Sequence, residues 1–270
     1  MVDRSKITLA ALAEMKEART PITMLTAYDA SMAGLFDAAG IDCILVGDSL
    51  GNVIQGRDST VPVSVDQMVY HVECVRRGTG CAMLIGDMPF LSYASESVAI
   101  QTARALMQAG AEMVKLEGGA PVLDIVARLS GLGVPVCGHL GLTPQSVHKL
   151  SGYRVQARAP EARARLLEDA AALEKAGCAM LVLECIPRKL AAEVSANLEI
   201  PVIGIGAGAQ VDGQVLVSYD ALGIGSGRKP RFVRDFMADS TSLESAVHEY
   251  IAAVRERRFP ADKESYADPV

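Results

Sequence analysis

The feature that most constrains this chain is a pattern that recurs along it: a glycine, then an unbroken apolar run, then an acidic residue. The clearest copy is residues 176–184, Ala-Gly-Cys-Ala-Met-Leu-Val-Leu-Glu. Two more copies cover residues 39–48 and 109–117, and a fourth run, 81–87, lacks the leading Ala-Gly. Glycines of this kind end helices, and short apolar runs are typical of buried parallel strands. The four runs end in acidic side chains: Asp48, Asp87, Glu117 and Glu184.

Apolar runs alternate with helical patterns over the whole chain. We expect strands at residues 22–26, 44–46, 81–85, 113–117, 134–138, 178–184, 200–205 and, from a weaker pattern, 221–224. We expect helices at residues 8–19, 31–39, 64–77, 96–108, 122–129, 161–175, 188–197 and 242–257. This alternation, without a break in composition, predicts an α/β fold, a (β/α)8 TIM barrel in a single domain over residues 1–270. A short N-terminal helix precedes the barrel and a polar tail from Phe259 follows it, while a doubly wound open sheet is the alternative architecture.

Two long segments interrupt the alternation. Residues 50–63 contain Gly51, Asn52, Gly56 and Pro62, show no periodicity and follow Asp48 directly. Long loops in compact domains are usually functional, so we predict that this one is a lid. Residues 141–159 form a second polar loop, rich in Gly, Ser and basic residues.

Composition and charge argue against several classes of function. Half of the 270 residues are hydrophobic, which is enough for a large core. The net charge of −6 gives no reason to expect nucleic acid or a membrane as partner, although a local cation can still bind a small anion. No stretch has the length of an apolar membrane span, and the N-terminus lacks the apolar core of a signal peptide. The six cysteines have no Cys-x-x-Cys spacing, which predicts buried free thiols and a cytoplasmic location.

The four acidic strand ends predict a metal site. In a parallel barrel all carboxyl ends of the strands meet at one mouth, so these side chains would converge. Unpaired carboxylates that converge repel one another, and a divalent cation relieves the repulsion. An all-oxygen ligand set suits Mg²⁺ or a similar hard ion, whereas Zn²⁺ would find at most one imidazole, that of His139.

Glu184 is the best candidate for a general base. Its neighbours Leu183, Cys185 and Ile186 are apolar, and desolvation would raise the pKa of its carboxyl group toward the working range of a base. The alternative is structural: Glu184 would form a salt bridge with Arg188 at the start of the next helix.

Lys115 stands two residues before Glu117, so both side chains point to the same side of a strand. A lysine within an apolar run can form a Schiff base or act as a point charge on a carboxylate or enolate. Nearby carboxylates keep an ammonium protonated, which favours the role of a point charge. A salt bridge within the barrel is the structural alternative.

His139 either positions a ligand or is a structural histidine whose hydrogen bonds are satisfied within the protein. The glycines of residues 204–208 give only a weak indication of a phosphate site.

Four motifs, in this order, resemble the ketopantoate hydroxymethyltransferase family. They are VGDSLG at residues 46–51, VKLEGG at 114–119, GHLGLTPQ at 138–145 and GIGAG at 204–208. The resemblance runs from Ile7 to the Phe-Pro-Ala sequence at residues 259–261. Ser151 stands where the commoner family pattern has Gly, which puts only the conformation of its loop in question.

The resemblance implies a (β/α)8 barrel that assembles as a homodecamer and uses Mg²⁺. It implies that Asp48 and Asp87 bind the metal, that Glu117 completes the metal environment directly or through water, and that Glu184 is the proton acceptor. The residues expected to bind the substrate are Asp48, Ser49, Asp87, Lys115 and His139.

The same resemblance implies the reaction. A hydroxymethyl group passes from 5,10-methylenetetrahydrofolate to 3-methyl-2-oxobutanoate and gives 2-dehydropantoate, the first step of pantothenate biosynthesis. Glu184 would remove the C3 proton of the metal-chelated keto acid. A Mg²⁺-dependent carbon–carbon lyase or phosphonomutase that acts on a related keto acid is the nearer alternative, and a non-catalytic binding barrel is the more distant one.

Overall fold

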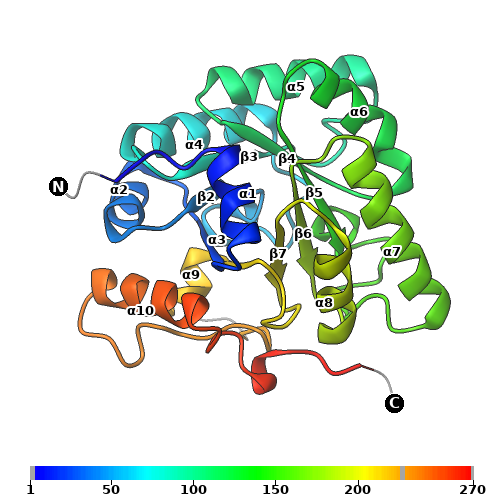
Figure 1. Cartoon of the computed structure of the whole chain (residues 1–270). Helices are drawn as coiled ribbons and strands as arrows, with labels where there is room; N and C mark the ends of the chain where they lie inside the picture. The colour runs from blue at the N-terminus through cyan, green and yellow to red at the C-terminus, as the bar shows by residue number, and fades with distance from the viewer. Residues whose placement is uncertain (1–3, 226–228, 269–270) are drawn as a thin grey trace.

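The computed structural model describes residues 4–225 and 229–268, and a ring of parallel strands stands at its centre (Figure 1). The strands are β1 (Ile22–Thr26), β2 (Cys43–Val46), β3 (Met83–Asp87), β4 (Met113–Glu117), β5 (Val136–Gly141), β6 (Met180–Glu184), β7 (Val202–Ile205) and β8 (Gly213–Leu216). Each strand pairs with its neighbours in sequence order, and β8 pairs with β1 to close the barrel. The prediction of a single (β/α)8 barrel is confirmed, and the open sheet is excluded.

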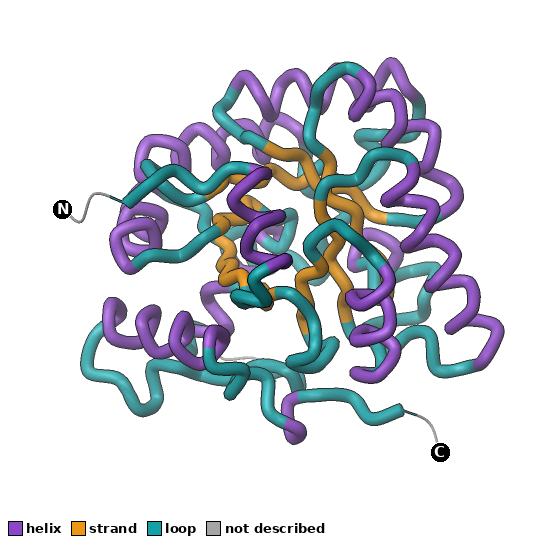
Figure 2. The backbone as a smooth tube through the Cα atoms, viewed as in Figure 1, coloured by secondary structure: helices purple, strands orange, loops and turns teal. Residues whose placement is uncertain are grey.

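Helices surround the barrel, as the purple and orange segments of Figure 2 show. The α-helices are α1 (Leu9–Glu17), α2 (Ala30–Ala39), α3 (Leu50–Val53), α4 (Val65–Gly78), α5 (Glu96–Gln108), α6 (Leu123–Gly131), α7 (Pro160–Lys175), α8 (Arg188–Asn197), α9 (Ser218–Ala221) and α10 (Leu243–Arg255). Short 3₁₀ turns are η1 (Ala120–Val122), η2 (Pro144–Ser146) and η3 (Asp262–Glu264). A capping box opens α4, where the Ser64 side chain accepts from the backbone of Gln67 and the Gln67 side chain accepts from the backbone of Ser64.

The predicted position of the eighth strand, residues 221–224, is wrong. The strand is β8, and α9 together with the turn that follows it occupies the predicted position. The apolar signal of β8 is weak because it contains Gly213 and Gln214. A Cβ at Gly213 would lie 2.4 Å from the carbonyl oxygen of Ile22, so the close pairing with β1 requires glycine. Gln214 is buried but satisfied, since its side chain donates to the Gly208 carbonyl at 3.0 Å.

The N-terminal segment covers one end of the barrel. Lys6 contacts the carbonyl of Ala82 just before β3, and Lys16 pairs with Asp212 just before β8 at 2.6 Å. Arg4 pairs with Asp42 just before β2. These contacts all lie at the amino ends of the strands, so the opposite end, where the acidic side chains emerge, is left for a ligand.

The two long loops are more ordered than their sequence indicates. In residues 50–63 a short helix, α3, begins after the three residues that follow β2, and Leu50 and Val63 are buried. The role of this segment as a lid stays a prediction. In the second loop, Ser151 has a φ of 56°, in the left-handed region that favours glycine.

The C-terminal segment packs against the barrel. Phe259 and Glu264 are buried, and the Phe259 ring lies 5.4 Å from that of Phe236 and 6.0 Å from that of Tyr250. This segment is therefore packed more closely than the polar tail that the sequence predicts. The sequence pattern did not indicate the packing because the apolar residues that anchor the segment are few and widely spaced.

No helix in the described ranges is long and apolar enough to cross a membrane. The cysteines are free thiols; Cys74 and Cys81 are partly exposed and the others are buried.

Candidate active site

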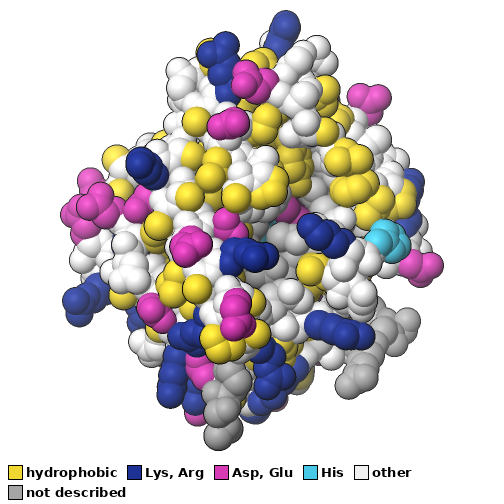
Figure 3. Space-filling view, turned by 90° about the vertical axis from the view of Figure 1, so that its right-hand side faces the viewer, with side chains coloured by type: hydrophobic (Ala, Val, Ile, Leu, Met, Phe, Trp, Pro, Cys, Tyr) yellow, Lys and Arg dark blue, Asp and Glu magenta, His cyan; other side chains and the backbone are white. Residues whose placement is uncertain are grey.

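A cavity of about 1110 Å³ opens at the carboxyl ends of the strands. All the predicted site residues line it: Asp48, Ser49, Asp87, Lys115, Glu117, His139 and Glu184. They come from the ends of β2 to β6, so the ring of strands brings together residues that are far apart in sequence. Figure 3 shows Lys and Arg side chains beside a hollow near the centre of one face of the molecule.

Strand register pairs the lysine with one of the acids. Asp87 of β3 is the register partner of Lys115 of β4, and the Lys115 Nζ lies 2.7 Å from both carboxylate oxygens of Asp87. Burial raises the pKa of Asp87 to about 8, although the Lys115 charge opposes the rise. Burial alone would lower the pKa of Lys115, but the carboxylates of Asp87 and Glu117 outweigh it and raise that pKa. Lys115 therefore remains a cation, which favours the point-charge role over a Schiff base.

His139 lies between two carboxylates. It is the register partner of Glu117; its Nδ1 lies 3.3 Å from Glu117 Oε1 and its Nε2 lies 3.3 Å from Glu184 Oε2. Neither contact has hydrogen-bond alignment, so within the described residues both ring nitrogens and Glu117 Oε1 are buried without partners. Burial lowers the pKa of His139 and raises the pKa of Glu117 to about 6. Such unpaired buried atoms indicate that a ligand completes the site.

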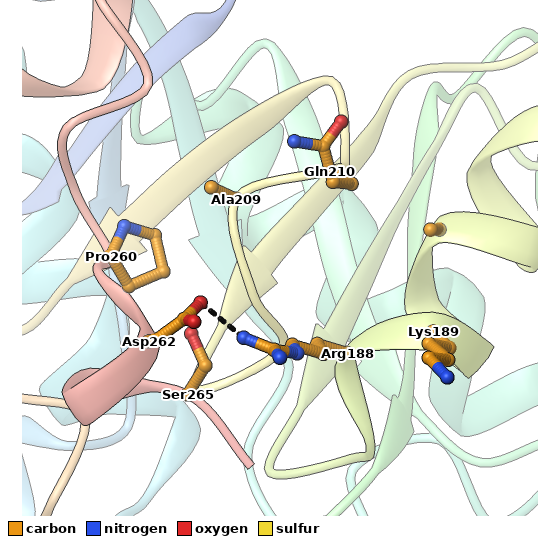
Figure 4. Close-up of a pocket in the computed structure, with 8 residues that line it drawn as sticks. Arg188, Lys189, Ala209, Gln210, Pro260, Asp262 and Ser265 are labelled. Atoms are coloured by element: carbon orange, nitrogen blue, oxygen red, sulfur yellow. Dashed lines mark hydrogen bonds and ion pairs between the residues drawn. The ribbon is translucent and has the colours of Figure 1, made fainter. Parts of the chain in front are cut away.

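Glu184 stands apart from the acid–lysine pair, at the end of β6. Its side chain is 13% exposed, and burial raises the pKa of its carboxyl group, with His139 opposing the rise. The alternative salt bridge with Arg188 does not form: Arg188 instead pairs with Asp262, and Figure 4 shows this contact in a separate cavity of about 300 Å³ between α8 and the C-terminal segment. The glycine motif at residues 204–208 borders that region, where a Cβ at Gly208 would lie 2.5 Å from the Arg188 Cβ. This glycine permits close packing.

Gln145 is the site residue that sequence reasoning missed. It lies in η2 and is buried, and its side-chain amide donates to Asp48 Oδ2 at 3.0 Å and to the Met88 carbonyl at 2.9 Å. Its backbone N–H donates to Glu117 Oε2 at 3.0 Å, and its side-chain oxygen accepts from the Tyr93 hydroxyl at 2.6 Å. The only sequence signal is its place at the end of the GHLGLTPQ motif, just after β5. Ser49 has a partner too, since its hydroxyl lies 2.8 Å from that of Tyr28.

The acidic residues fit a metal held by few protein ligands. Burial raises the pKa of Asp48, and the nearby Glu117 carboxylate raises it further. Three carboxyl groups, those of Asp48, Asp87 and Glu117, share this site with the single ammonium of Lys115, and their raised pKa values show that burial disfavours their ionised forms there. A divalent cation would favour the ionised forms. In the part of the chain that the structure describes, no three His, Cys, Asp or Glu side chains form a ready metal cluster. This arrangement suits Mg²⁺, which is commonly held by one or two carboxylates together with water and substrate.

Comparison with solved structures finds the same fold in enzymes of another type. Phosphonopyruvate hydrolase in complex with oxalate and Mg²⁺ superposes with a TM-score of 0.60 at 12% identity, over 93% of this chain and 96% of that one. The 2,3-dimethylmalate lyase, a member of the PEP mutase/isocitrate lyase superfamily, gives a TM-score of 0.56 at 18% identity, over 80% and 82% of the two chains. At this identity the likeness shows the fold alone.

Sequence comparison is far more specific. The 3-methyl-2-oxobutanoate hydroxymethyltransferase of Shewanella loihica is 53% identical over 263 residues, which cover 97% of this chain and all of the relative. A second relative, 3-methyl-2-oxobutanoate hydroxymethyltransferase 2 of Hahella chejuensis, is 52% identical over 96% of this chain and 98% of its own length. The family model for ketopantoate hydroxymethyltransferase matches residues 6–262. The chain therefore belongs to the ketopantoate hydroxymethyltransferase family of enzymes.

Proposed function

We propose that this enzyme transfers a hydroxymethyl group from 5,10-methylenetetrahydrofolate to 3-methyl-2-oxobutanoate and so carries out the first step of pantothenate biosynthesis. One observation carries the proposal. Lys115, Glu117 and Glu184 line the same cavity as His139, whose two ring nitrogens are buried without hydrogen-bond partners among the described residues. The names of the relatives at 52–53% identity support the same substrate.

Glu184 is the general base of the proposed reaction. A desolvated carboxylate with a raised pKa is a stronger base than an exposed one, and Glu184 accepts the C3 proton of the keto acid. The electron pair of the broken C–H bond becomes that of an enolate, whose charge is stabilised by the ammonium of Lys115. The enolate carbon then bonds to the methylene carbon of the donor, and a water molecule supplies the hydroxyl oxygen. The two bonds from that carbon to the donor nitrogens break, and the nitrogens take up the proton held by Glu184 and one proton of the water, so that tetrahydrofolate leaves.

We propose Mg²⁺ as the metal, held by Asp48 and Asp87, with Glu117 nearby. A bound Mg²⁺ polarises the keto group and makes the C3 proton more acidic. The clustering of three buried carboxyl groups around one ammonium supports the assignment, as does the phosphonopyruvate hydrolase of the same fold, whose structure holds Mg²⁺ with oxalate. Oxalate shares with a 2-oxo acid two adjacent carbon–oxygen groups.

The other polar groups position the substrate. The Ser49 hydroxyl, already paired with Tyr28, borders the cavity and donates to the substrate carboxylate. The ring of His139 lies beside both Glu117 and Glu184 without a hydrogen bond to either, so a neutral ring can offer its one N–H to the keto acid. The lowered pKa of His139 supports a neutral ring.

Hydrogen isotope exchange tests the proposal without the second substrate. The purified protein with Mg²⁺ and 3-methyl-2-oxobutanoate in D₂O is expected to exchange the C3 hydrogen in the absence of folate, as monitored by proton NMR. Addition of 5,10-methylenetetrahydrofolate should then yield 2-dehydropantoate. A protein that catalyses neither step contradicts the proposal, and a binding barrel without activity would behave in this way.

The same assay separates the nearer alternative. A lyase or phosphonomutase would cleave or rearrange a 2-hydroxy acid or a phosphonate acid and would leave 3-methyl-2-oxobutanoate unchanged. The solved structures of such enzymes share only the fold with this chain, so the alternative has no specific support in its site.

We further propose that the enzyme is a cytoplasmic homo-oligomer, with a decamer as the expected size. The family resemblance supports this assembly, and the free cysteines fit a reducing compartment. Light scattering coupled to size-exclusion chromatography measures the mass directly. A mass of one chain, 28.5 kDa, would contradict the oligomer.

A further inference from the structure

One hydroxyl group in the cavity has no partner. Thr60 is 2% exposed and lines the cavity, and its Oγ1 is buried without a hydrogen-bond partner in residues 4–225 and 229–268. Glu117 Oε1 and the two ring nitrogens of His139 are unpaired atoms of the same cavity. Unpaired hydroxyls are uncommon in protein interiors because burial removes their hydrogen bonds to water. The Thr60 hydroxyl therefore indicates a partner that enters the cavity with the ligand.

Thr60 lies beside the first turn of α3. The backbone N–H of Gly51 in that turn donates to the Asp48 carbonyl at 2.9 Å. A Cβ at Gly51 would lie 3.3 Å from the Ser59 carbonyl oxygen and 3.5 Å from the Thr60 Cα. Glycine thus lets the backbone at Thr60 pack directly on the turn that follows Asp48 and Ser49. Two hydroxyls, those of Ser49 and Thr60, are in this way placed near Asp48.

The segment that carries Thr60 is folded on itself. The Asn52 side chain donates to the Arg57 carbonyl at 2.8 Å, and the Arg57 backbone donates to the Gly51 carbonyl at 2.8 Å. After Thr60, the backbone N–H of the buried Val63 donates to the Thr60 carbonyl at 3.1 Å. These contacts fix the backbone on both sides of Thr60. A hydroxyl that is already in place binds a ligand without the entropy cost of ordering its segment.

The neighbouring groups do not satisfy the Thr60 hydroxyl. It lies close enough to the Asp48 carboxylate to oppose the rise in the pKa of that group, yet the two do not form an aligned hydrogen bond. Asp48 Oδ2 already accepts from the Gln145 amide at 3.0 Å. The acceptor that suits Thr60 is therefore one that a ligand brings to this side of the cluster, beside the metal ligand that we propose.

We propose that Thr60 is a substrate-binding residue whose hydroxyl donates to the carboxylate of the 2-oxo acid, together with the hydroxyl of Ser49. This inference rests on the proposed function for the identity of the acid. An ionised carboxylate accepts about four hydrogen bonds, whereas a hydroxyl donates only one. The substrate carboxylate can therefore accept from both hydroxyls near Asp48. The contact gives residues 50–63 a direct part in binding the substrate.

The variant T60V tests the contact, because valine keeps the shape of threonine and removes the hydroxyl. In calorimetry with Mg²⁺ present, we expect the dissociation constant of 3-methyl-2-oxobutanoate to rise by about tenfold or more, since a hydrogen bond to a charged group is lost. Mg²⁺ alone should bind with unchanged affinity. The free protein loses a hydroxyl that has no partner, so its midpoint of thermal unfolding should stay the same or rise. T60S keeps the hydroxyl and should bind the acid as the unmodified enzyme does.

The matched control is T102V. Thr102 on α5 is buried outside the cavity, and its hydroxyl donates to the Ser92 carbonyl at 2.8 Å. The same replacement there breaks a hydrogen bond that the free protein makes. T102V should therefore lower the midpoint of thermal unfolding and leave the affinity for the acid unchanged, which is the opposite of the pattern expected for T60V. A merely structural Thr60 would behave as Thr102 does.

Three results overturn the inference. The first is an unchanged affinity for the acid in T60V. The second is an equal loss of affinity for Mg²⁺ alone, which would make the hydroxyl a support of the metal. The third is a fall in the unfolding midpoint as large as that of T102V, which would show that the hydroxyl has a partner within the protein. If T60V does not fold, T60A is compared with T60S, and equal affinity for the acid in these two variants is the contradicting result.

Oxalate separates this inference from the proposed function. It carries a carboxylate next to a second carbon–oxygen group, as a 2-oxo acid does, and it has no C3 hydrogen to exchange. An enzyme that exchanges no C3 hydrogen, but whose T60V variant binds oxalate with Mg²⁺ more weakly, disproves the proposed function and supports the carboxylate contact. An enzyme that exchanges C3 hydrogen, but whose T60V variant binds the keto acid and oxalate unchanged, disproves the contact alone.

Discussion

The side-chain amide of Gln145 lies 3.0 Å from Oδ2 of Asp48, and this contact ties a loop residue to a carboxylate that we expect to bind the metal. The backbone of the same residue donates to Glu117 Oε2. One residue therefore orients two acidic groups that would otherwise repel each other. In metal sites, such supporting hydrogen bonds fix the direction of the ligands and contribute to metal affinity.

Replacement of Gln145 by Leu should weaken Mg²⁺ binding. The variant leaves Asp48 Oδ2 without its donor, and loss of a supporting contact of this kind typically costs about 10- to 100-fold in metal affinity or activity. Calorimetric titration with Mg²⁺ measures the effect. Gln101→Leu, at an exposed position of α5, is the matched control and should bind as the unmodified enzyme does. Unchanged Mg²⁺ affinity in Gln145→Leu would show that the contact does not support the metal.

Replacement of Asp87 by Asn should also weaken Mg²⁺ binding, by roughly tenfold or more, because it removes a proposed ligand charge. The change also removes the partner of Lys115, so the ammonium loses its strongest stabilising contact. Asp66→Asn, at an exposed position of α4, serves as the control. If calorimetry gave equal Mg²⁺ affinity for Asp87→Asn and for the control, Asp87 would not be a ligand.

The fold and most of the site could be predicted from the sequence because both depend on local patterns. Seven of the eight strands lie where their apolar runs indicate, and the acidic strand ends necessarily meet at one mouth of a parallel barrel. The misplaced strand, β8, owes its position to pairing with β1 and β7, which is a tertiary contact. The role of Gln145 was not predicted for a similar reason: glutamine is common in loops, and only the folded chain brings this residue beside Asp48.

Replacement of Glu184 by Gln should abolish C3 exchange while substrate and Mg²⁺ still bind. The amide keeps the shape of the side chain but accepts no proton, and loss of a general base typically lowers a rate by about 10²- to 10⁴-fold. Exchange followed by proton NMR and Mg²⁺ binding followed by calorimetry separate the two effects. Retained exchange in Glu184→Gln would assign the base to another residue.

The pH dependence of exchange follows from the same carboxyl group. Only the ionised form of Glu184 accepts a proton, so the rate should increase as the pH rises through the pKa of Glu184. Because burial raises that pKa, the midpoint should lie above the ordinary range of glutamate. Glu184→Asp keeps a carboxylate and should retain a rising limb, whereas Glu184→Gln should lose it. A midpoint in the ordinary range of an exposed glutamate would contradict the desolvated environment.

The contact between Glu264 and Arg234 should stabilise the C-terminal segment. The Glu264 carboxylate accepts from Arg234 Nε at 2.8 Å and from Arg234 Nη2 at 2.6 Å, and it also accepts from the backbone of Ala261 at 2.7 Å. Glu264→Gln removes the charge but keeps the shape, and we expect it to lower the free energy of unfolding by about 1–3 kcal/mol at neutral pH. Chemical unfolding measures this difference. Glu256→Gln, in an exposed pair with Arg258, is the matched control and should change it far less, because solvent screens the pair.

The effect of Glu264→Gln should also depend on pH. Burial would raise the pKa of Glu264, but the hydrogen bonds from Arg234 and Ala261 outweigh burial and hold that pKa below the ordinary value. A group with a lowered pKa in the folded state stabilises the protein above its unfolded-state pKa and loses that contribution as the pH falls toward the folded-state pKa. The difference between the unmodified enzyme and Glu264→Gln should therefore be largest at neutral pH and shrink below the ordinary glutamate range. A difference that stays constant on acidification would mean that packing, and not the charge of Glu264, holds the segment against the barrel.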